Sequence, residues 1–260
     1  MKILITGGNG YVAKSLHDAL KDDYQVTVIS RDDLDLTDYF QVLKYFSSRE
    51  FDVVLHCAVA GGSRLRKDDM QVLDNNLKMY YNLLAFKNKF KKFIHFGSGA
   101  EDLARDTPYG LSKYVIKKSI EQQNNFHNVQ IFGLFDENEL DTRFIKANIK
   151  RYINKKPMEI SVHKKMTLFY MKDFVRLLRH IVDNSSTRLQ KQICCSYSTN
   201  YTLREIADMI NNLGDYKVPI HMTEEFGEDY IPDKVSQHRV VKYVGLEQGI
   251  KEVYKKLLNE

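Results

Sequence analysis

The fold is decided by one stretch near the N-terminus, Thr6-Gly7-Gly8-Asn9-Gly10-Tyr11-Val12-Ala13. An apolar run typical of a buried strand precedes it, and helical spacing of apolar residues continues from it to Leu20. Glycines at such a junction allow a tight turn and let the backbone approach a pyrophosphate, which then lies at the helix N-terminus. We therefore interpret the turn as a dinucleotide-binding site, in preference to a plain strand–helix connection. The residues expected to bind the cofactor here are Gly7, Gly8, Asn9, Gly10, Tyr11 and Val12.

Strand-like and helix-like segments alternate through the first half of the chain. Strands are predicted at 2–6, 24–29, 51–56, 92–96 and 129–132, and helices at 11–20, 37–46, 69–86 and 108–122, with Thr37 as an N-cap. This alternation favours a parallel sheet with helices on both faces. After about residue 133, shorter strands mix with helices. We predict an α/β fold with a doubly wound parallel sheet in residues 1–135, which also takes back residues 167–190, and a small mixed substrate-binding domain in 136–260, interleaved with it.

Composition and charge are those of a globular chain. The 260 residues include 39 basic and 34 acidic side chains, for a formal net charge of +5. Three cysteines without CxxC or Cys/His spacing predict neither a metal site nor a disulfide scaffold. The N-terminal apolar run is too short for a signal peptide, and no apolar run reaches the roughly 20 residues of a membrane span. We expect a cytoplasmic protein with no membrane or nucleic-acid partner, because the basic residues form no aromatic-interleaved stripe.

The end of the second predicted strand bears on the choice of dinucleotide. NAD-specific sites usually place an acidic residue there to bind the adenosine ribose hydroxyls. This chain has Ser30 and Arg31 instead, and a guanidinium with its planar fork of donors suits a ribose 2′-phosphate. NADP(H) is favoured, while Asp32 and Asp33 directly afterwards leave NAD(H) as the alternative.

Three side chains at and after the end of the fourth predicted strand suggest proton-transfer chemistry. Ser98 ends that strand, and Tyr109 and Lys113 follow four residues apart on a predicted helix, so they share one face. A nearby ammonium lowers the pKa of a phenol, and tyrosine can then exchange a proton near neutral pH. A Tyr-x-x-x-Lys pattern is common by chance, and here its position downstream of a dinucleotide turn and a strand-end serine gives it weight. We predict Ser98, Tyr109 and Lys113 as catalytic residues.

Taken together, these motifs resemble those of the extended short-chain dehydrogenase/reductase family, which comprises NAD(P)-dependent epimerases, dehydratases and reductases of nucleotide sugars. The resemblance runs nearly end to end, and the 31–36 segment with the Gly61-Gly62 pair is most similar to GDP-fucose synthase and related 4-keto-sugar reductases. It implies a Rossmann-type fold. It also implies that Tyr109 exchanges a proton with a sugar oxygen, that Ser98 hydrogen-bonds that oxygen, and that Lys113 binds the nicotinamide ribose.

The resemblance extends the expected sites beyond the glycine turn. Added cofactor-binding residues are Asp35, Leu36, Cys57, Ala58, Val59 and Asn76, with Tyr109 and Lys113. The expected substrate-binding residues are Gly99, Ala100, Gly133 and Arg143. By the same resemblance, the chain forms a homodimer through the helices predicted at 69–86 and 108–122.

Departures from the family pattern narrow the expected chemistry. Ala100 stands where GDP-fucose synthases carry a cysteine for epimerisation, and their partner histidine has no evident counterpart between Asp136 and Phe144. Without extra acid/base groups, the simplest reaction is NADP(H)-dependent reduction of a keto group on a nucleotide-linked sugar. Two alternatives stay open: an NAD-dependent nucleotide-sugar 4-epimerase, and a catalytically idle family member that acts as a binding protein.

Overall fold

A six-stranded sheet organises the first part of the chain in the computed structural model, which describes residues 1–63, 66–233 and 241–259. The strand order is β10-β5-β4-β3-β1-β2, and the β1–β2, β1–β3, β3–β4 and β4–β5 pairs are parallel. The strands are β1 (Lys2–Thr6), β2 (Gln25–Ile29), β3 (Phe51–His56), β4 (Phe90–Ser98), β5 (Phe126–Ile131) and β10 (Gln192–Cys195). Because the chain leaves β1 first for β2 and then for β3 on its other side, the sheet has a topological switch point at β1, where ligands bind in such folds.

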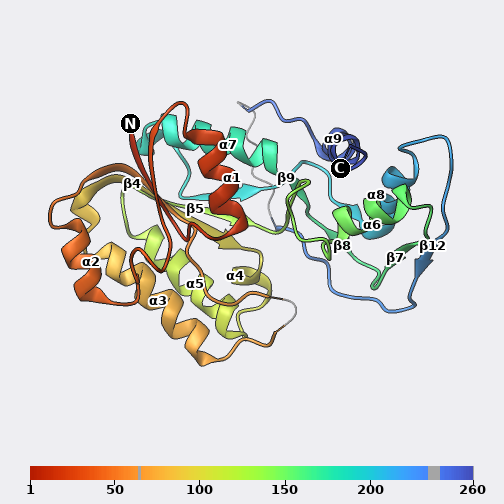
Figure 1. The fold of residues 1–260 in the computed structure, drawn as a ribbon. Helices are drawn as coiled ribbons and strands as arrows, with labels where there is room; N and C mark the ends of the chain where they lie inside the picture. Colours follow the sequence, from red (N-terminus) through yellow and green to blue (C-terminus); the bar gives the residue numbers. More distant parts are fainter. Residues whose placement is uncertain (64–65, 234–240, 260) are drawn as a thin grey trace. The chain divides into compact units, whose positions relative to one another are not determined.

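Helices cover both faces of this sheet, as the alternation of segments predicts. Figure 1 shows α1 on one face, with α3 and α5, which pack against each other, on the opposite face. The helices are α1 (Tyr11–Leu20), α2 (Tyr39–Phe46), α3 (Met70–Leu84), α4 (Ala100–Leu103) and α5 (Pro108–Glu121), with a 3₁₀ turn at Lys87–Lys89. Phe93 and Phe126 stack in the core with ring centroids 4.6 Å apart. The predicted Rossmann-type α/β class is confirmed.

One predicted helix start is wrong. Thr37 is not the N-cap of α2, because it lies one residue before the N-cap position, and its hydroxyl donates to Asp35 (2.7 Å) in the preceding turn. Asp38 caps the helix instead, and its carboxylate accepts from the amides of Phe40 (2.9 Å) and Gln41 (3.2 Å). A carboxylate that accepts hydrogen bonds from two amides is a stronger cap than the Thr37 hydroxyl, so the helix begins two residues later than predicted.

The chain divides into two compact units, Met1–Ile131 with Arg179–Ile193, and Phe132–Leu178 with Cys194–Glu260. The sequence pattern predicts that residues 167–190 return to the first unit, and the segment that does so is 179–193. Residues 168–170 stay in the second unit because Phe169 and Tyr170 pair with Leu134 and Phe135, and Leu168 and Tyr170 join its apolar core.

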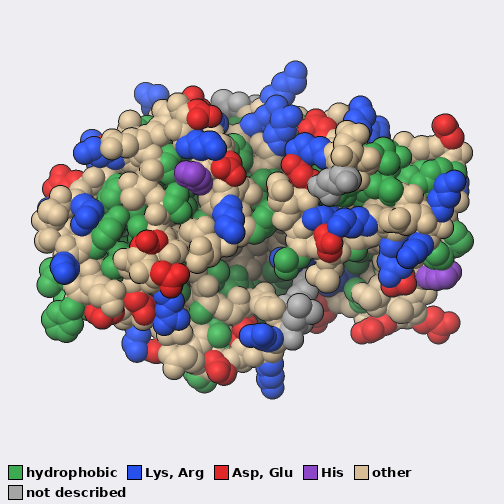
Figure 2. Space-filling view, viewed as in Figure 1, with side chains coloured by type: hydrophobic (Ala, Val, Ile, Leu, Met, Phe, Trp, Pro, Cys, Tyr) green, Lys and Arg blue, Asp and Glu red, His purple; other side chains and the backbone are tan. Residues whose placement is uncertain are grey.

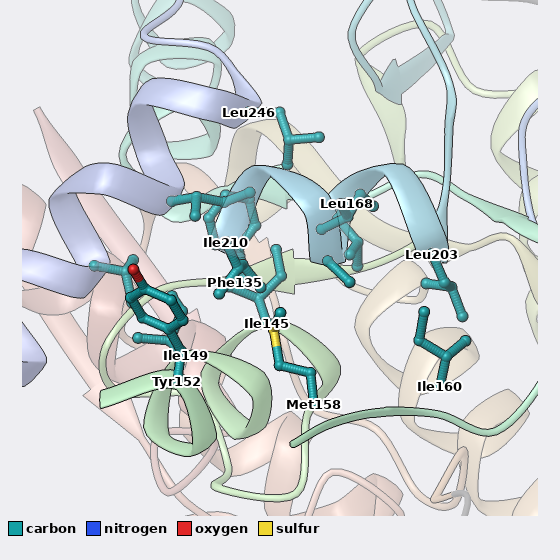
Figure 3. Packing of buried hydrophobic residues seen from close by; sticks show 14 of the residues in the cluster. Phe135, Ile145, Ile149, Tyr152, Met158, Ile160, Leu168, Leu203, Ile210 and Leu246 are labelled. Carbon is teal, nitrogen blue, oxygen red and sulfur yellow. The ribbon is translucent and has the colours of Figure 1, made fainter. Parts of the chain in front are cut away.

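The described residues of the second unit form short strands and helical segments. Its strands are β6 (Leu134–Phe135), β7 (Met158–Ile160), β8 (Lys165–Met166), β9 (Phe169–Tyr170), β11 (Tyr201–Thr202) and β12 (Ile220–Met222). Its helices are α6 (Phe144–Ile153), α8 (Leu203–Asn211), α9 (Leu246–Leu257) and, up to Leu178, the first part of α7 (Met171–Asp183). The end of α7 and the 3₁₀ turn at Ser186–Arg188 belong to the first unit. Side chains from α6, α8 and β7, including Ile149, Ile210 and Met158, converge in one buried cluster (Figure 3).

Charge is mixed over the surface. Figure 2 shows Lys and Arg side chains interspersed with Asp and Glu over the visible face. Across the described ranges, no helix has the length and apolar character needed to cross a bilayer. Within the same ranges, no cluster of three or more His, Cys, Asp or Glu side chains could hold a metal ion.

Candidate active site

A cavity of about 290 Å³ opens at the carboxyl ends of β1, β2 and β3, the switch point of the sheet. Its walls contain many of the predicted cofactor residues, namely Gly7, Asn9, Gly10, Ser30, Arg31, Asp35, Leu36, Cys57, Ala58 and Val59. Ile29, Leu34, Thr37, Ala60, Asn75 and Met79 also line it and were not predicted. Gly8, Tyr11, Val12, Asn76, Tyr109 and Lys113 do not line it. The predicted cofactor turn and the two following strand ends therefore share one cavity.

Gly7 shapes the floor of this cavity. It has a positive φ of 70°, and a Cβ at this position would lie 2.7 Å from the backbone N and Cα of Ala58. The turn then closes through a hydrogen bond from the Gly10 amide to the Gly7 carbonyl (2.9 Å). Gly10 is the N-cap of α1 and offers no side chain to the first amides of the helix. Those amides and the positive end of the helix dipole suit a phosphate group, so the turn fits a dinucleotide.

The loop after β2 holds the groups expected to select the cofactor. The Asp33 carboxylate accepts from both the amide and the hydroxyl of Ser30 (2.8 Å each), and these bonds lower the pKa of Asp33. Asp35 accepts from the Thr37 hydroxyl, which lowers its pKa, and Arg31 lies 3.3 Å away. The Arg31 side chain is 78% exposed. The two carboxylates thus bind within their own loop, and the largely exposed Arg31 guanidinium donates to Asp35 in that loop (3.3 Å).

Thr6 and His56 link the ends of β1 and β3 beneath the cavity. The Thr6 hydroxyl lies 3.0 Å from His56 Nδ1 and accepts from the Ala58 amide (3.1 Å). Both side chains are buried. Burial, with the Lys113 charge as a smaller contribution, lowers the pKa of His56 to about 3.

This low pKa makes the contribution of His56 to stability pH-dependent. In the unfolded chain the imidazole binds a proton near its ordinary pKa of 6.5, but in the folded chain it does so only near 3. Acidification below about pH 6.5 therefore favours the unfolded state by about 1.4 kcal/mol per pH unit for this histidine. We expect the difference in unfolding free energy between the wild type and His56→Asn to shrink by this amount per unit below pH 6.5. Urea titrations at several pH values measure it, with His17→Asn at a half-exposed position as the control. A difference that stays constant with pH would contradict the expectation.

Ser98 occupies the end of β4, directly before the short helix α4. Its hydroxyl accepts from the Ala100 amide (3.2 Å), and its own amide donates to the Glu101 carboxylate (3.2 Å). Ser98 is buried at the junction of β4 and α4. The sequence prediction located the serine but gave no role to Glu101.

Tyr109 and Lys113 lie in the first turns of α5. Pro108 is near the helix start and Thr107 is the N-cap, as the early proline predicts. The Lys113 ammonium is buried, donates to the Phe96 carbonyl (2.6 Å), and lies 5.8 Å from the centroid of the Tyr109 ring. Burial lowers the pKa of Lys113 to about 8. The predicted pair therefore shares one face of α5, with a buried cation beside a phenol ring.

Two glycines determine what lies against Tyr109. A Cβ on Gly110 would lie 1.9 Å from the Ala104 carbonyl, so glycine lets α5 contact the backbone that follows α4. A Cβ on Gly62 would lie 2.7 Å from the Tyr109 ring, so the Gly61-Gly62 loop passes directly over the phenol. The Asp68 carboxylate accepts from the Gly62 amide (3.1 Å) and holds this loop.

Asn76 connects the cavity to α5 without lining the cavity. Its amide binds both the N–H (2.7 Å) and the C=O (3.0 Å) of Ala60 and donates to the Ser112 hydroxyl (3.0 Å). Ala60 is part of the cavity wall and Ser112 belongs to the helix that bears Tyr109. Asn76 therefore fixes the cavity wall at Ala60 relative to helix α5, which bears Tyr109.

The predicted substrate residues belong to different units. Gly99 and Ala100 lie in the first unit at the start of α4, where the Gly99 amide donates to the Ile131 carbonyl (2.9 Å). Gly133 lies in the second unit, and its carbonyl accepts from the Phe169 amide (2.8 Å). Arg143 is exposed at the N-cap of α6 in the same unit. Their role in substrate binding stays a prediction.

The fold and the glycine-turn cavity define a Rossmann-type dinucleotide-binding enzyme. Residues 3–194 match the model of the NAD dependent epimerase/dehydratase family. The chain belongs to this family, which confirms the resemblance stated from the sequence and the expectation of an NAD(P)-dependent enzyme.

Individual relatives are distant. CDP-abequose synthase of Yersinia pseudotuberculosis is 22% identical over 241 residues, which span 83% of this chain and 85% of the relative. The GDP-mannoheptose C4 reductase MlghC of Campylobacter jejuni, solved with NADP bound, matches with a TM-score of 0.80 at 18% identity over 99% of this chain and 98% of its own. A GDP-L-fucose synthetase of Naegleria fowleri matches with a TM-score of 0.79 at 18% identity over 100% and 94%. At these identities the solved structures show a shared fold.

Proposed function

We propose that this protein is an NADP(H)-dependent oxidoreductase that reduces a keto group of a nucleotide-linked sugar. The observation that carries the proposal is the buried Lys113 ammonium beside the Tyr109 ring, on a helix that Asn76 ties to the wall of the dinucleotide cavity. The names of the relatives support it, since MlghC is a C4 reductase of a GDP-linked sugar. CDP-abequose synthase likewise forms a nucleotide-linked sugar.

The proposed roles follow from the donor and acceptor capacity of each side chain. When the dinucleotide is bound with its pyrophosphate on the glycine turn, its nicotinamide supplies the hydride for the carbonyl carbon. The Tyr109 hydroxyl donates a proton to the carbonyl oxygen, and the Ser98 hydroxyl hydrogen-bonds the same oxygen. Lys113, held by the Phe96 carbonyl, places a positive charge beside the phenol and stabilises negative charge that develops there.

The side chains around Ser98 favour reduction over more elaborate chemistry. Ala100 is an apolar residue at the start of α4, and the neighbouring acid Glu101 is fully buried with its carboxylate already bound to Ser98 and Asn128. A simple ketone reduction needs a single proton donor, which Tyr109 provides.

The proposal is tested by incubating the protein with NADPH and a panel of nucleotide-linked keto-sugars. We expect NADPH to be consumed only when a keto-sugar is present. Mass spectrometry of the cofactor that co-purifies addresses the epimerase alternative, because an epimerase retains NAD and interconverts sugars without net oxidation. A folded, cofactor-loaded protein that is inert on the whole panel would instead support the binding-protein alternative.

Arg31 is expected to determine the preference for NADPH. A hydrogen bond to a charged group contributes about 1.5–3 kcal/mol, and the exposed position of Arg31 places it at the lower end. Arg31→Ala should therefore raise the KM for NADPH about tenfold and leave the KM for NADH unchanged. Steady-state kinetics with both cofactors measure this, with the exposed Arg49→Ala as the control. An equal effect on both cofactors would show that Arg31 does not contact a 2′-phosphate.

A further inference from the structure

The carboxyl group of Glu101 is fully buried and contacts the backbone amide of Ser98. One carboxylate oxygen accepts from the Ser98 amide (3.2 Å), and the other accepts from Asn128 Nδ2 on β5 (2.9 Å). Gly97 makes room for this arrangement, because a Cβ there would lie 2.5 Å from Glu101 Oε2 and 2.6 Å from Asn128 Oδ1. Burying a carboxylate is costly unless it is hydrogen-bonded, and these two contacts offset that cost.

The charges around Glu101 come from α4 and α5. Lys117 on α5 lies 3.6 Å from Glu101 Oε1 and also binds Asp102 on α4 (2.9 Å). Lys113 on α5 is a second, weaker cationic influence, and Asp102 is the nearby like charge. Burial outweighs the cations and raises the pKa of Glu101 to about 7. The carboxyl group therefore changes its protonation state near neutral pH.

Protonation of Glu101 disturbs the hydrogen bonds that it now accepts. In the ionised form both oxygens act as acceptors for N–H donors on Ser98 and Asn128. In the protonated form one oxygen carries a hydrogen and needs an acceptor of its own. Within the described part of the chain, Asn128 Oδ1 is a buried atom without a partner. The Asn128 group that faces Glu101 is the donor Nδ2, which also binds Gln192, so the amide would have to turn to offer Oδ1. Deprotonation of Glu101 thus favours the arrangement in which its carboxylate accepts from the Ser98 amide and from Asn128.

We propose that Glu101 is a positioning residue for Ser98, which holds the serine in its hydrogen-bonding orientation through the backbone amide while the carboxyl group is ionised. The catalytic part of this inference rests on the proposed function of Ser98. The structural part is independent of it, since the contact between the Glu101 carboxylate and the Ser98 amide exists whatever the substrate is.

The inference is tested by following the Ser98 amide resonance by NMR as a function of pH in the cofactor-free, full-length protein. In the wild type we expect the resonance to shift with a midpoint near pH 7, because an amide that donates to a carboxylate responds to its ionisation. Glu101→Gln should abolish the shift. Glu121→Gln, which removes a surface carboxylate on α5 that pairs with Lys118, should leave it intact. A wild-type resonance that does not titrate, or titrates equally in Glu101→Gln, would overturn the inference.

A second variant keeps the test decisive if Glu101→Gln does not fold. Lys117→Met removes the cation that favours the ionised form but leaves the contact with Ser98, so the midpoint should move to higher pH. An unchanged midpoint would contradict the network described above.

Turnover provides the functional arm of the experiment. With a keto-sugar substrate, Glu101→Gln should lower kcat about tenfold, leave the KM for NADPH unchanged and remove the fall in kcat below pH 7. If the wild type reduces no keto-sugar, the proposed function fails while the NMR titration still decides the position of Glu101. A Glu101→Gln enzyme with wild-type kcat and pH profile would overturn the functional arm alone.

Discussion

Tyr109→Phe is expected to lower kcat for keto-sugar reduction by about 10²–10⁴-fold, the range typical of losing a general acid. The change removes one oxygen and keeps the ring, so the contact with Gly62 and the proximity of Lys113 are preserved. Affinity for the cofactor should change little, because Tyr109 does not line the cavity at the glycine turn, where we propose that the cofactor binds. The loss should therefore appear in kcat with NADPH binding intact.

A tyrosine on the same helix provides the matched control. Tyr114 packs under Arg105, whose guanidinium lies 4.3 Å from the ring centroid, and its hydroxyl has no role in the proposed reaction. Tyr114→Phe should keep wild-type kcat. A Tyr109→Phe enzyme that retains more than a tenth of the wild-type kcat would show that the proton comes from another group.

The second large effect is expected at Gly7. Alanine at this position would place Cβ 2.7 Å from backbone atoms of Ala58, which cannot move aside as a flexible side chain could. It would also need a φ of 70°, which costs an L-residue about 1–2 kcal/mol. Because the turn forms the cavity floor, we expect Gly7→Ala to raise the Kd for NADPH by at least about tenfold, a loss of about 1.4 kcal/mol or more.

A second glycine variant distinguishes the effect of backbone strain from the effect of a lost cofactor contact. Gly245 has a φ of 90°, and nothing lies within 4 Å of a Cβ built there. Gly245→Ala should lower stability by strain alone and leave NADPH affinity unchanged, as measured by calorimetric titration and thermal unfolding. Equal Kd values for wild type and Gly7→Ala would refute the placement of the cofactor on this turn.

Local patterns were sufficient to predict most of the first unit. The strand, glycine turn and helix at its start follow from residue spacing alone, and so does the shared face of Tyr109 and Lys113 on α5. These features depend on residues that are neighbours in the chain, where periodicity and backbone sterics act directly.

Contacts between distant segments could not be predicted in this way. The bond between Glu101 and Asn128 depends on the register of β4 and β5, which places Gly97 opposite Gln130, and no local pattern encodes that register. The same holds for Met79, which α3 contributes to the cavity wall. The prediction of Thr37 as the N-cap is wrong because the next residue, Asp38, accepts from both first-turn amides.

Transfer of a deuteride tests the central claim most directly. The protein is incubated with a nucleotide-linked keto-sugar and NADPH deuterated at the transferable position of the nicotinamide, and the sugar product is analysed by mass spectrometry and NMR. We predict an alcohol with deuterium on the former carbonyl carbon, formed in proportion to the NADP⁺ produced, and at least about 10²-fold slower formation of this product by Tyr109→Phe. A rearranged sugar without deuterium, or no product from a folded and NADPH-bound protein, would contradict the account.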